Sequence, residues 1–202
     1  DHRHATSNDV INLSKLSKKR NVEFNIEGNP FNKPNGDFLG FIELVEIIKP
    51  DQVTLVPDEL NQITSDHGWS QGNHDEDLID AITNIRNCSK DSKISLFIDD
   101  IEGVAYANSL NVELIEIHTG KFAKNISDGD EFIVDEVKNI AKSAQNMGIL
   151  VNAGHDLNLE NLKYLVMMGY INEVSIGHAI IVDSLHYGYE ETIKKYLKII
   201  RS

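Results

Sequence analysis

The sequence predicts an α/β protein whose parallel strands close into a barrel. Six short runs rich in Val, Ile and Phe alternate with amphipathic segments, an order typical of right-handed βαβ units. No G-x-G-x-x-G motif follows the first run, which disfavours an open dinucleotide-binding sheet. Polar residues stand at the ends of nearly every run, as in the TIM (β/α)8 barrel, where all strand ends meet at one mouth.

The expected strands are short and evenly distributed. They lie at residues 21–26, 52–57, 93–99, 114–120, 149–154 and 173–178. Several, such as residues 94–98, are apolar nearly throughout, which is typical of a strand covered on both faces. Apolar residues at helical spacing predict helices between them. A closed barrel of this type has eight strands, so the first two β/α units are expected to be missing from the N-terminus of a single barrel domain over residues 1–202.

The composition narrows the class of function. A formal net charge of -13 leaves no basic stripe for a phosphate backbone, so we expect no nucleic-acid partner. No apolar run approaches the roughly 20 residues of a membrane-spanning helix, and the single cysteine cannot form an internal disulfide. The chain begins with neither an initiator Met nor a signal peptide. We therefore expect a cytoplasmic protein, trimmed at its N-terminus, that binds small anionic molecules rather than a membrane.

Two carboxylates and a histidine are the main catalytic candidates. Glu116 lies mid-strand between apolar neighbours, where loss of water raises the pKa of a carboxyl group and suits it to proton transfer. Glu23 is either a catalytic base or a rim carboxylate paired with a cation. Gly154 lets the chain turn sharply before His155, which favours an acid or base over a structural histidine. His118 is expected to be structural.

The last expected strand ends in Gly177 and His178, just before a helix. Barrels often bind phosphate there through N–H groups of a glycine-containing turn and of the helix N-terminus, although a plain βα turn has the same sequence. Arg3 and His4 offer cationic contacts to a second anion, or are frayed surface residues. The sequence therefore predicts one phosphate site and suggests another.

Two other functions remain open. A Schiff-base aldolase is disfavoured because no Lys lies inside a strand beyond its first residue, or directly after a strand, except Lys121. A metal-dependent barrel hydrolase would use His2, His4 and the strand-end histidines, but no strand precedes His2 to hold the pair in place. A non-catalytic barrel that binds a phosphorylated ligand is the other alternative.

Taken together, the motifs resemble one known family. They are Asp1-x-Arg3-His4, Asn21-Val22-Glu23, Leu55-Val56-Pro57 with Thr64, Ser95-Leu96-Phe97-Ile98, Ile115-Glu116-Ile117-His118-Thr119-Gly120, Val151-Asn152-Ala153-Gly154-His155 and Ile176-Gly177-His178-Ala179-Ile180. In this order, over essentially the whole chain, they resemble the pyridoxine 5′-phosphate synthases, the ring-closing enzymes of the deoxyxylulose-5-phosphate-dependent vitamin B6 pathway.

The resemblance implies an eight-stranded barrel in a homo-oligomer, usually an octamer, that uses no metal or organic cofactor. Such an enzyme condenses 1-deoxy-D-xylulose 5-phosphate with 3-amino-2-oxopropyl phosphate and releases phosphate and water to form pyridoxine 5′-phosphate. The resemblance also implies that Glu23 is a general base, that His155 is a general acid and that Glu116 stabilises charge in the transition state.

The resemblance assigns binding residues as well. His4 and Thr64 match positions that bind the deoxyxylulose phosphate, whereas Gly177 and His178 match the phosphate-binding turn for the other substrate. Asp156 matches a further binding position at which the family usually has Gly. Because a carboxylate repels an anion, we expect that contact to use the backbone. The family's first two strands, with their Asn, Asp-His, His and Arg residues, would precede this chain.

Overall fold

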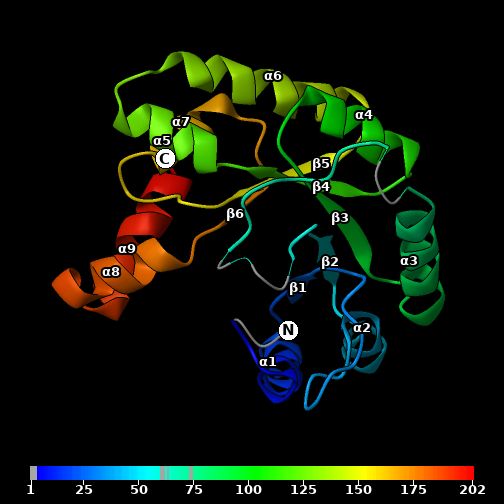
Figure 1. The fold of residues 1–202 in the computed structure, drawn as a ribbon. Coiled ribbons are helices and arrows are strands. Elements are labelled where there is room, and N and C mark those ends of the chain that lie inside the picture. The colour runs from blue at the N-terminus through cyan, green and yellow to red at the C-terminus, as the bar shows by residue number, and fades with distance from the viewer. Residues whose placement is uncertain (1–3, 60–61, 63, 73–74) are drawn as a thin grey trace.

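Six parallel strands form one curled sheet in the computed structural model (Figure 1). The structure describes residues 4–59, 62, 64–72 and 75–202. The strands are β1 (Asn25–Gly28), β2 (Gln52–Leu55), β3 (Lys93–Ile98), β4 (Leu114–His118), β5 (Leu150–Gly154) and β6 (Glu173–Ser175). Each strand pairs in parallel with the next one along the chain. A doubly wound open sheet reverses its strand order at a switch point, so this unbroken order confirms an α/β fold wound as barrels are.

Helices connect the strands and cover the outer face of the sheet (Figure 1). They are α1 (Ser7–Arg20), α2 (Phe41–Ile48), α3 (Asp75–Cys88), α4 (Ile101–Ser109), α5 (Gly120–Ser127), α6 (Phe132–Asn146), α7 (Leu162–Met168), α8 (His178–Tyr187) and α9 (Tyr189–Ile200). Helices α1 and α2 lie beside the β1 edge, whereas α8 and α9 lie beyond β6 (Figure 1). None of the helices in the described part of the chain is long and apolar enough to traverse a bilayer.

The two faces of the sheet differ in chemistry because side chains alternate between them along each strand. The outward residues pack under the helices and are apolar, as are Val53, Leu55, Ile94, Leu96, Ile98, Ile115, Ile117 and Val151. Most inward positions hold buried polar residues, namely Gln52, Thr54, Ser95, Glu116 and Asn152, although the inward Phe97 and Leu114 are apolar. The expectation of strands apolar on both faces therefore holds for the outer face only. The concave face forms a polar floor.

Hydrogen bonds join this floor across the sheet. Asn152 Nδ2 donates to Gln52 Oε1 at 3.4 Å, and Gln52 Nε2 donates to Thr54 Oγ1 at 3.2 Å. Thr54 Oγ1 donates to Asn25 Oδ1 at 3.2 Å, and Asn25 Nδ2 donates to Glu27 Oε1 at 2.9 Å. A buried amide or hydroxyl without a partner is costly, and this chain of hydrogen bonds satisfies Asn152, Gln52 and Thr54 before it ends on a carboxylate.

The first strand begins later than the sequence predicts. Helix α1 ends with Asn21 in the left-handed conformation, at a φ of 53°, and β1 begins only at Asn25. The expected strand over residues 21–26 therefore starts four residues too early, because the chain needs a short connection between the helix and the sheet. This shift places Glu27, and not Glu23, near the carboxyl end of the strand.

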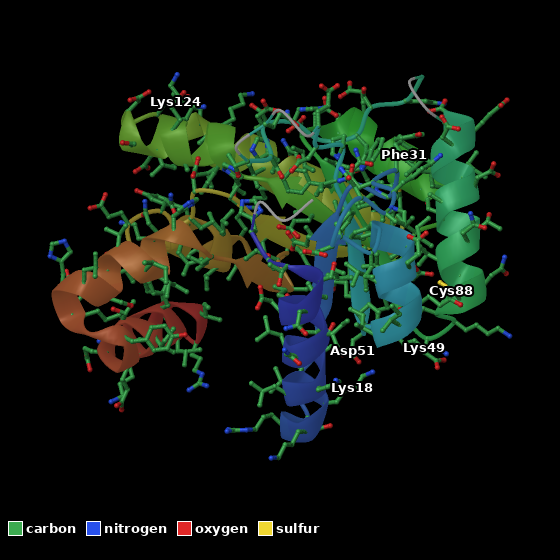
Figure 2. All side chains as sticks on the ribbon, turned by 60° about the horizontal axis from the view of Figure 1, so that its bottom comes forward. Lys18, Phe31, Lys49, Asp51, Cys88 and Lys124 are labelled. Atoms are coloured by element: carbon green, nitrogen blue, oxygen red, sulfur yellow. The ribbon has the colours of Figure 1, made fainter. Side chains whose placement is uncertain are left out.

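The two ends of the sheet are well separated. In Figure 2, Lys18 and Asp51 lie at the end where the strands begin, and Phe31, which follows β1, lies at the opposite end. Parallel strands bring all their carboxyl ends to this second end, which is where barrels build their sites.

Candidate active site

A cavity of about 1140 Å³ opens at the carboxyl ends of the strands. Its walls come from β1, β3, β4 and β6 and from the connections that follow β2, β5 and β6. Seven of the eight site residues predicted from the sequence line it, namely His4, Thr64, Glu116, His155, Asp156, Gly177 and His178. The structure thus brings together side chains that are far apart in the sequence.

Glu116 lies at the bottom of this cavity. The residue is 2% exposed, and its Oε2 atom has no hydrogen-bond partner among the described residues. Burial raises the pKa of Glu116 well above its usual range, and the neighbouring Glu27 carboxylate raises it further. Gly154 makes room for this carboxyl group, because a Cβ there would lie 2.1 Å from Glu116 Oε1. Both effects favour the protonated form of the Glu116 carboxyl group.

Glu27 faces Glu116 from β1, and the sequence interpretation missed it. The two carboxyl groups are hydrogen-bonded to each other. Glu27 is exposed to solvent and lines the cavity. Burial, followed by the charge of Glu173, raises the pKa of Glu27 to about 6. One sequence signal could have identified it: a carboxylate directly before Gly28, where the strand ends.

Glu23 lies outside this cavity. It precedes β1 and lines a smaller cavity of about 400 Å³ with Lys18, Asp51 and Lys93, at the end where the strands begin. Its charge raises the pKa of Glu173, the first residue of β6, after the larger effect of burial. The expectation that Glu23 shares a site with His155 and Glu116 is therefore wrong for this structure. The physical reason is the late start of β1.

His155 follows β5 with an uncommon backbone conformation. Its φ is 92° and that of Asp156 is 56°, a region that non-glycine residues rarely adopt and that costs on the order of 1–3 kcal/mol per residue. The fully buried Thr119 holds this turn, since its hydroxyl lies 2.6 Å from the carbonyl oxygens of both Gly154 and His155. Asn161 Nδ2 donates to the Asp156 carbonyl at 3.0 Å. Such strain clusters at functional sites.

The imidazole of His155 points into the cavity between two polar neighbours. Its Nε2 lies 3.2 Å from Thr64 Oγ1. Its Nδ1 lies 3.1 Å from Asp156 Oδ2, but without hydrogen-bond alignment. The Asp156 carboxylate, whose side chain is 55% exposed, therefore faces the histidine as well as solvent. The ring depends on packing for its orientation.

Helix α8 begins at the cavity wall with His178. No side chain caps this helix, and a Cβ on Gly177 would meet no heavy atom within 4 Å. A helix N-terminus without a side-chain cap at a cavity wall is a position at which proteins bind phosphate through backbone N–H groups. His4 lies on the cavity wall and is exposed.

The alternative of a metal-dependent hydrolase rests on histidines that the structure describes only in part. His2 and Arg3 lie outside the described residues. Across residues 4–59, 62, 64–72 and 75–202, no group of three or more His, Cys, Asp or Glu side chains is arranged to hold a metal ion.

Comparison with solved structures supports the fold. Thiamine phosphate pyrophosphorylase from Pyrococcus furiosus superposes with a TM-score of 0.61, covering 98% of this chain and 79% of that protein. The two sequences are only 12% identical, so the likeness concerns architecture alone. It agrees with a TIM-like arrangement of parallel strands.

Comparison of sequences identifies the family. Residues 1–202 match the family model described as pyridoxal phosphate biosynthesis protein PdxJ. The chain is 40% identical over 205 residues to the pyridoxine 5′-phosphate synthase of Xanthomonas axonopodis pv. citri, with 100% of this chain and 80% of that protein covered. It is 41% identical over 206 residues to the enzyme of the same name from Cytophaga hutchinsonii, at the same coverage. This chain belongs to the PdxJ family of pyridoxal phosphate biosynthesis proteins.

Proposed function

We propose that this protein catalyses the reaction for which its relatives are named, the formation of pyridoxine 5′-phosphate. The substrates are 1-deoxy-D-xylulose 5-phosphate and 3-amino-2-oxopropyl phosphate, and phosphate and water are released. The observation that carries the proposal is that Glu27, Glu116 and His155 line one cavity. A ring-closing condensation removes and delivers several protons on one substrate, so it needs an acid and a base within reach of the same bound molecule.

The carboxyl pair supplies two different functions. A pKa of about 6 leaves Glu27 largely ionised at neutral pH and still basic enough to accept a proton from carbon or nitrogen. Burial and the neighbouring Glu27 favour the protonated form of Glu116 by raising its pKa, and this form would donate a hydrogen bond to negative charge that develops on the substrate. We therefore assign the general base to Glu27 in place of Glu23, which lines the other cavity.

His155 is proposed as the general acid. Its ring lines the cavity and is 21% exposed, so that a bound substrate would exclude the remaining water. Thr64 Oγ1 is already at hydrogen-bond distance from Nε2, and a substrate hydroxyl or carbonyl oxygen would take that place during the reaction. An imidazole suits this task because it exchanges protons near neutral pH.

Two anion sites are proposed for the two phosphorylated substrates. The N-terminus of α8, at Gly177 and His178, would bind one phosphate through backbone N–H groups. His4 and Thr64, which line the same cavity, would bind the deoxyxylulose phosphate. Asp156 would contribute its backbone, since its side chain carries the wrong charge for a phosphate.

The complete fold and assembly form part of the proposal. We infer that the curled sheet corresponds to six strands of an eight-stranded barrel, because β1 and β6 are its two edges and one cavity spans both of them. The relatives are longer than the aligned region, which covers 80% of their length. A homo-oligomer, an octamer as in the family, is expected, and sedimentation equilibrium would measure it.

The direct test is turnover of the two substrates by the purified protein. Formation of pyridoxine 5′-phosphate would be followed by chromatography, and His155→Ala should reduce kcat by about 10²–10⁴-fold while leaving the circular dichroism spectrum unchanged. Near-normal turnover by this variant would contradict the assignment of His155 as the general acid. Prior treatment with a chelator separates the alternatives, since a metal-dependent hydrolase would lose its activity and the proposed condensation would not.

A further inference from the structure

Three rings stand in a row at the carboxyl ends of β3, β4 and β5. The ring centroids of Phe97 and His118 are 5.3 Å apart, and those of His118 and His155 are 4.9 Å apart with an interplanar angle of 87°. Phe97 and His155 line the cavity, whereas His118 is not among its lining residues. The His118 ring therefore packs edge-to-face against His155, the proposed general acid, from outside the cavity.

Asp99 fixes the orientation of His118. Its Oδ1 lies 2.8 Å from His118 Nδ1, and its Oδ2 accepts a hydrogen bond of 2.6 Å from the Gly68 N–H. Burial opposes ionisation of Asp99, but the hydrogen bonds from His118 and Gly68 outweigh it and lower the pKa of the carboxyl group. Asp99 is thus an ionised acceptor, and His118 carries its proton on Nδ1.

The same carboxylate anchors the loop that holds the other side of His155. The backbone of Gly68 packs closely against that of β3, because a Cβ on Gly68 would lie only 2.5 Å from Ile98 Cα. The next residue, Trp69, donates from its backbone N–H to Phe97 O at 2.8 Å and from Nε1 to Leu55 O at 2.9 Å. Gly68 and Trp69 thus fix one end of the loop that starts at Thr64. The hydroxyl of Thr64 lies 3.2 Å from His155 Nε2.

We propose that Asp99 and His118 are positioning residues for His155. The ring of His155 has no aligned hydrogen bond at Nδ1, and its backbone is strained, so packing has to hold it. Asp99 controls both contacts that do so, the edge of His118 and the loop that carries Thr64. The inference rests on the proposed role of His155 as general acid, and it assigns a task to two residues that do not touch the substrate.

The expected effect is on turnover rather than on binding. Asp99→Asn keeps the shape of the side chain but replaces one acceptor oxygen with a donor, so that His118 and the loop are no longer held together. Small displacements of a catalytic group cost about 10²-fold, so we expect kcat to fall by about 10- to 100-fold with KM within about twofold. His118→Phe keeps a ring against His155 but loses the bond to Asp99, and it should have a similar effect. The double variant should be no worse than the poorer single variant.

The neighbouring Asp100 provides a matched control. Its side chain accepts a hydrogen bond from the Gly103 N–H and caps α4, and Asn is an equally good cap. Asp100→Asn makes the same chemical change one residue away, and it should leave kcat within about twofold of the wild type.

A second measurement reports on His155 itself. With ¹³C-labelled histidine, the His155 ring resonance is assigned by its absence in His155→Ala, and it should move in Asp99→Asn but not in Asp100→Asn. A kcat of Asp99→Asn within about twofold of the wild type overturns the proposal, as does a lower kcat with an unmoved His155 resonance. If His155→Ala retains turnover, the proposed function fails, whereas the resonance still shows whether Asp99 positions the ring.

Discussion

The carboxyl groups of Glu27 and Glu116 are hydrogen-bonded to each other although their strands, β1 and β4, are not neighbours in the sheet. Only the curl of the sheet brings them together. Two neighbouring carboxyl groups, one of them buried, resist ionising together because their negative charges repel each other. The ionisation of each group therefore depends on the charge of the other.

Substitution of Glu27 in β1 and of Glu23, which precedes β1, should separate their roles. Glu27→Gln should lower kcat by about 10²–10⁴-fold, because an amide cannot accept the proton. Glu23→Gln makes the same change four residues earlier, in the smaller cavity, and kcat should stay within about twofold of the wild type. Initial rates of pyridoxine 5′-phosphate formation provide the measurement. The reverse pattern, with Glu23→Gln inactive and Glu27→Gln active, would restore the assignment made from the sequence.

Stability should fall as the pH rises through the titration of Glu27. The pKa of Glu27 is raised from 4.5 to about 6 in the folded state, so the folded protein holds this proton where the unfolded chain has released it. The effect on the free energy of unfolding between these pH values is on the order of 1 kcal/mol, since water in the open cavity screens part of it. Urea denaturation should show that Glu27→Gln removes this slope and that Glu23→Gln retains it. An unchanged slope in Glu27→Gln would contradict the raised pKa of this carboxyl group.

A methyl group at Gly154 should displace the acid beside it. The Cβ of Gly154→Ala would lie 2.1 Å from Glu116 Oε1 and 3.0 Å from Ser175 Cβ, so the Glu116 carboxyl group has to leave its position. We expect kcat to fall by about 10²-fold and the free energy of unfolding to fall by about 1–3 kcal/mol. In a Glu116→Ala background the stability cost of Gly154→Ala should largely vanish, which a double-mutant cycle measures. Equal costs in both backgrounds would show that the clash lies elsewhere.

The hydroxyl of Thr119 should be needed for the turn at His155. Thr119→Val keeps the shape of the side chain but leaves the carbonyl oxygens of Gly154 and His155 without this buried donor. Thermal or urea unfolding should show a loss of about 1–3 kcal/mol, with a lower kcat because the strained turn relaxes. Thr119→Ser retains the donor and should recover most of both losses. If Ser behaves like Val, shape rather than hydrogen bonding fixes the turn.

Local sequence patterns predicted much of this site. Alternation of apolar and polar residues indicates that Glu116 faces inward, and the structure confirms that it does. A glycine before His155 indicates a sharp turn, and the backbone there has a φ of 92°. Both patterns span only a few residues, so they can be interpreted without knowledge of the rest of the fold.

The first strand could not be placed in this way. Glu23 and Glu27 are four residues apart and share the inward parity, so a pattern with a period of two cannot choose between them. Which glutamate lies in the strand depends on tertiary contacts made by Asp51, the residue before β2. Its side chain accepts a hydrogen bond of 2.8 Å from the Phe24 N–H, and its own N–H donates to Phe24 O at 3.0 Å. The positions of Asp99 and Gly68 are set by similar contacts between distant segments.

The strand order also bears on how the molecule folds. Neighbouring strands are neighbours in sequence, so the sheet can grow one β/α unit at a time with short loops to close. The contact between Glu27 and Glu116 is different, because it joins segments with two further strands between them. The free-energy cost of desolvating these two acids therefore arises only after the intervening strands have formed. A chain that has been synthesised only as far as β3 does not yet have this cost. Assembly of the catalytic pair should therefore be a late event on the folding pathway.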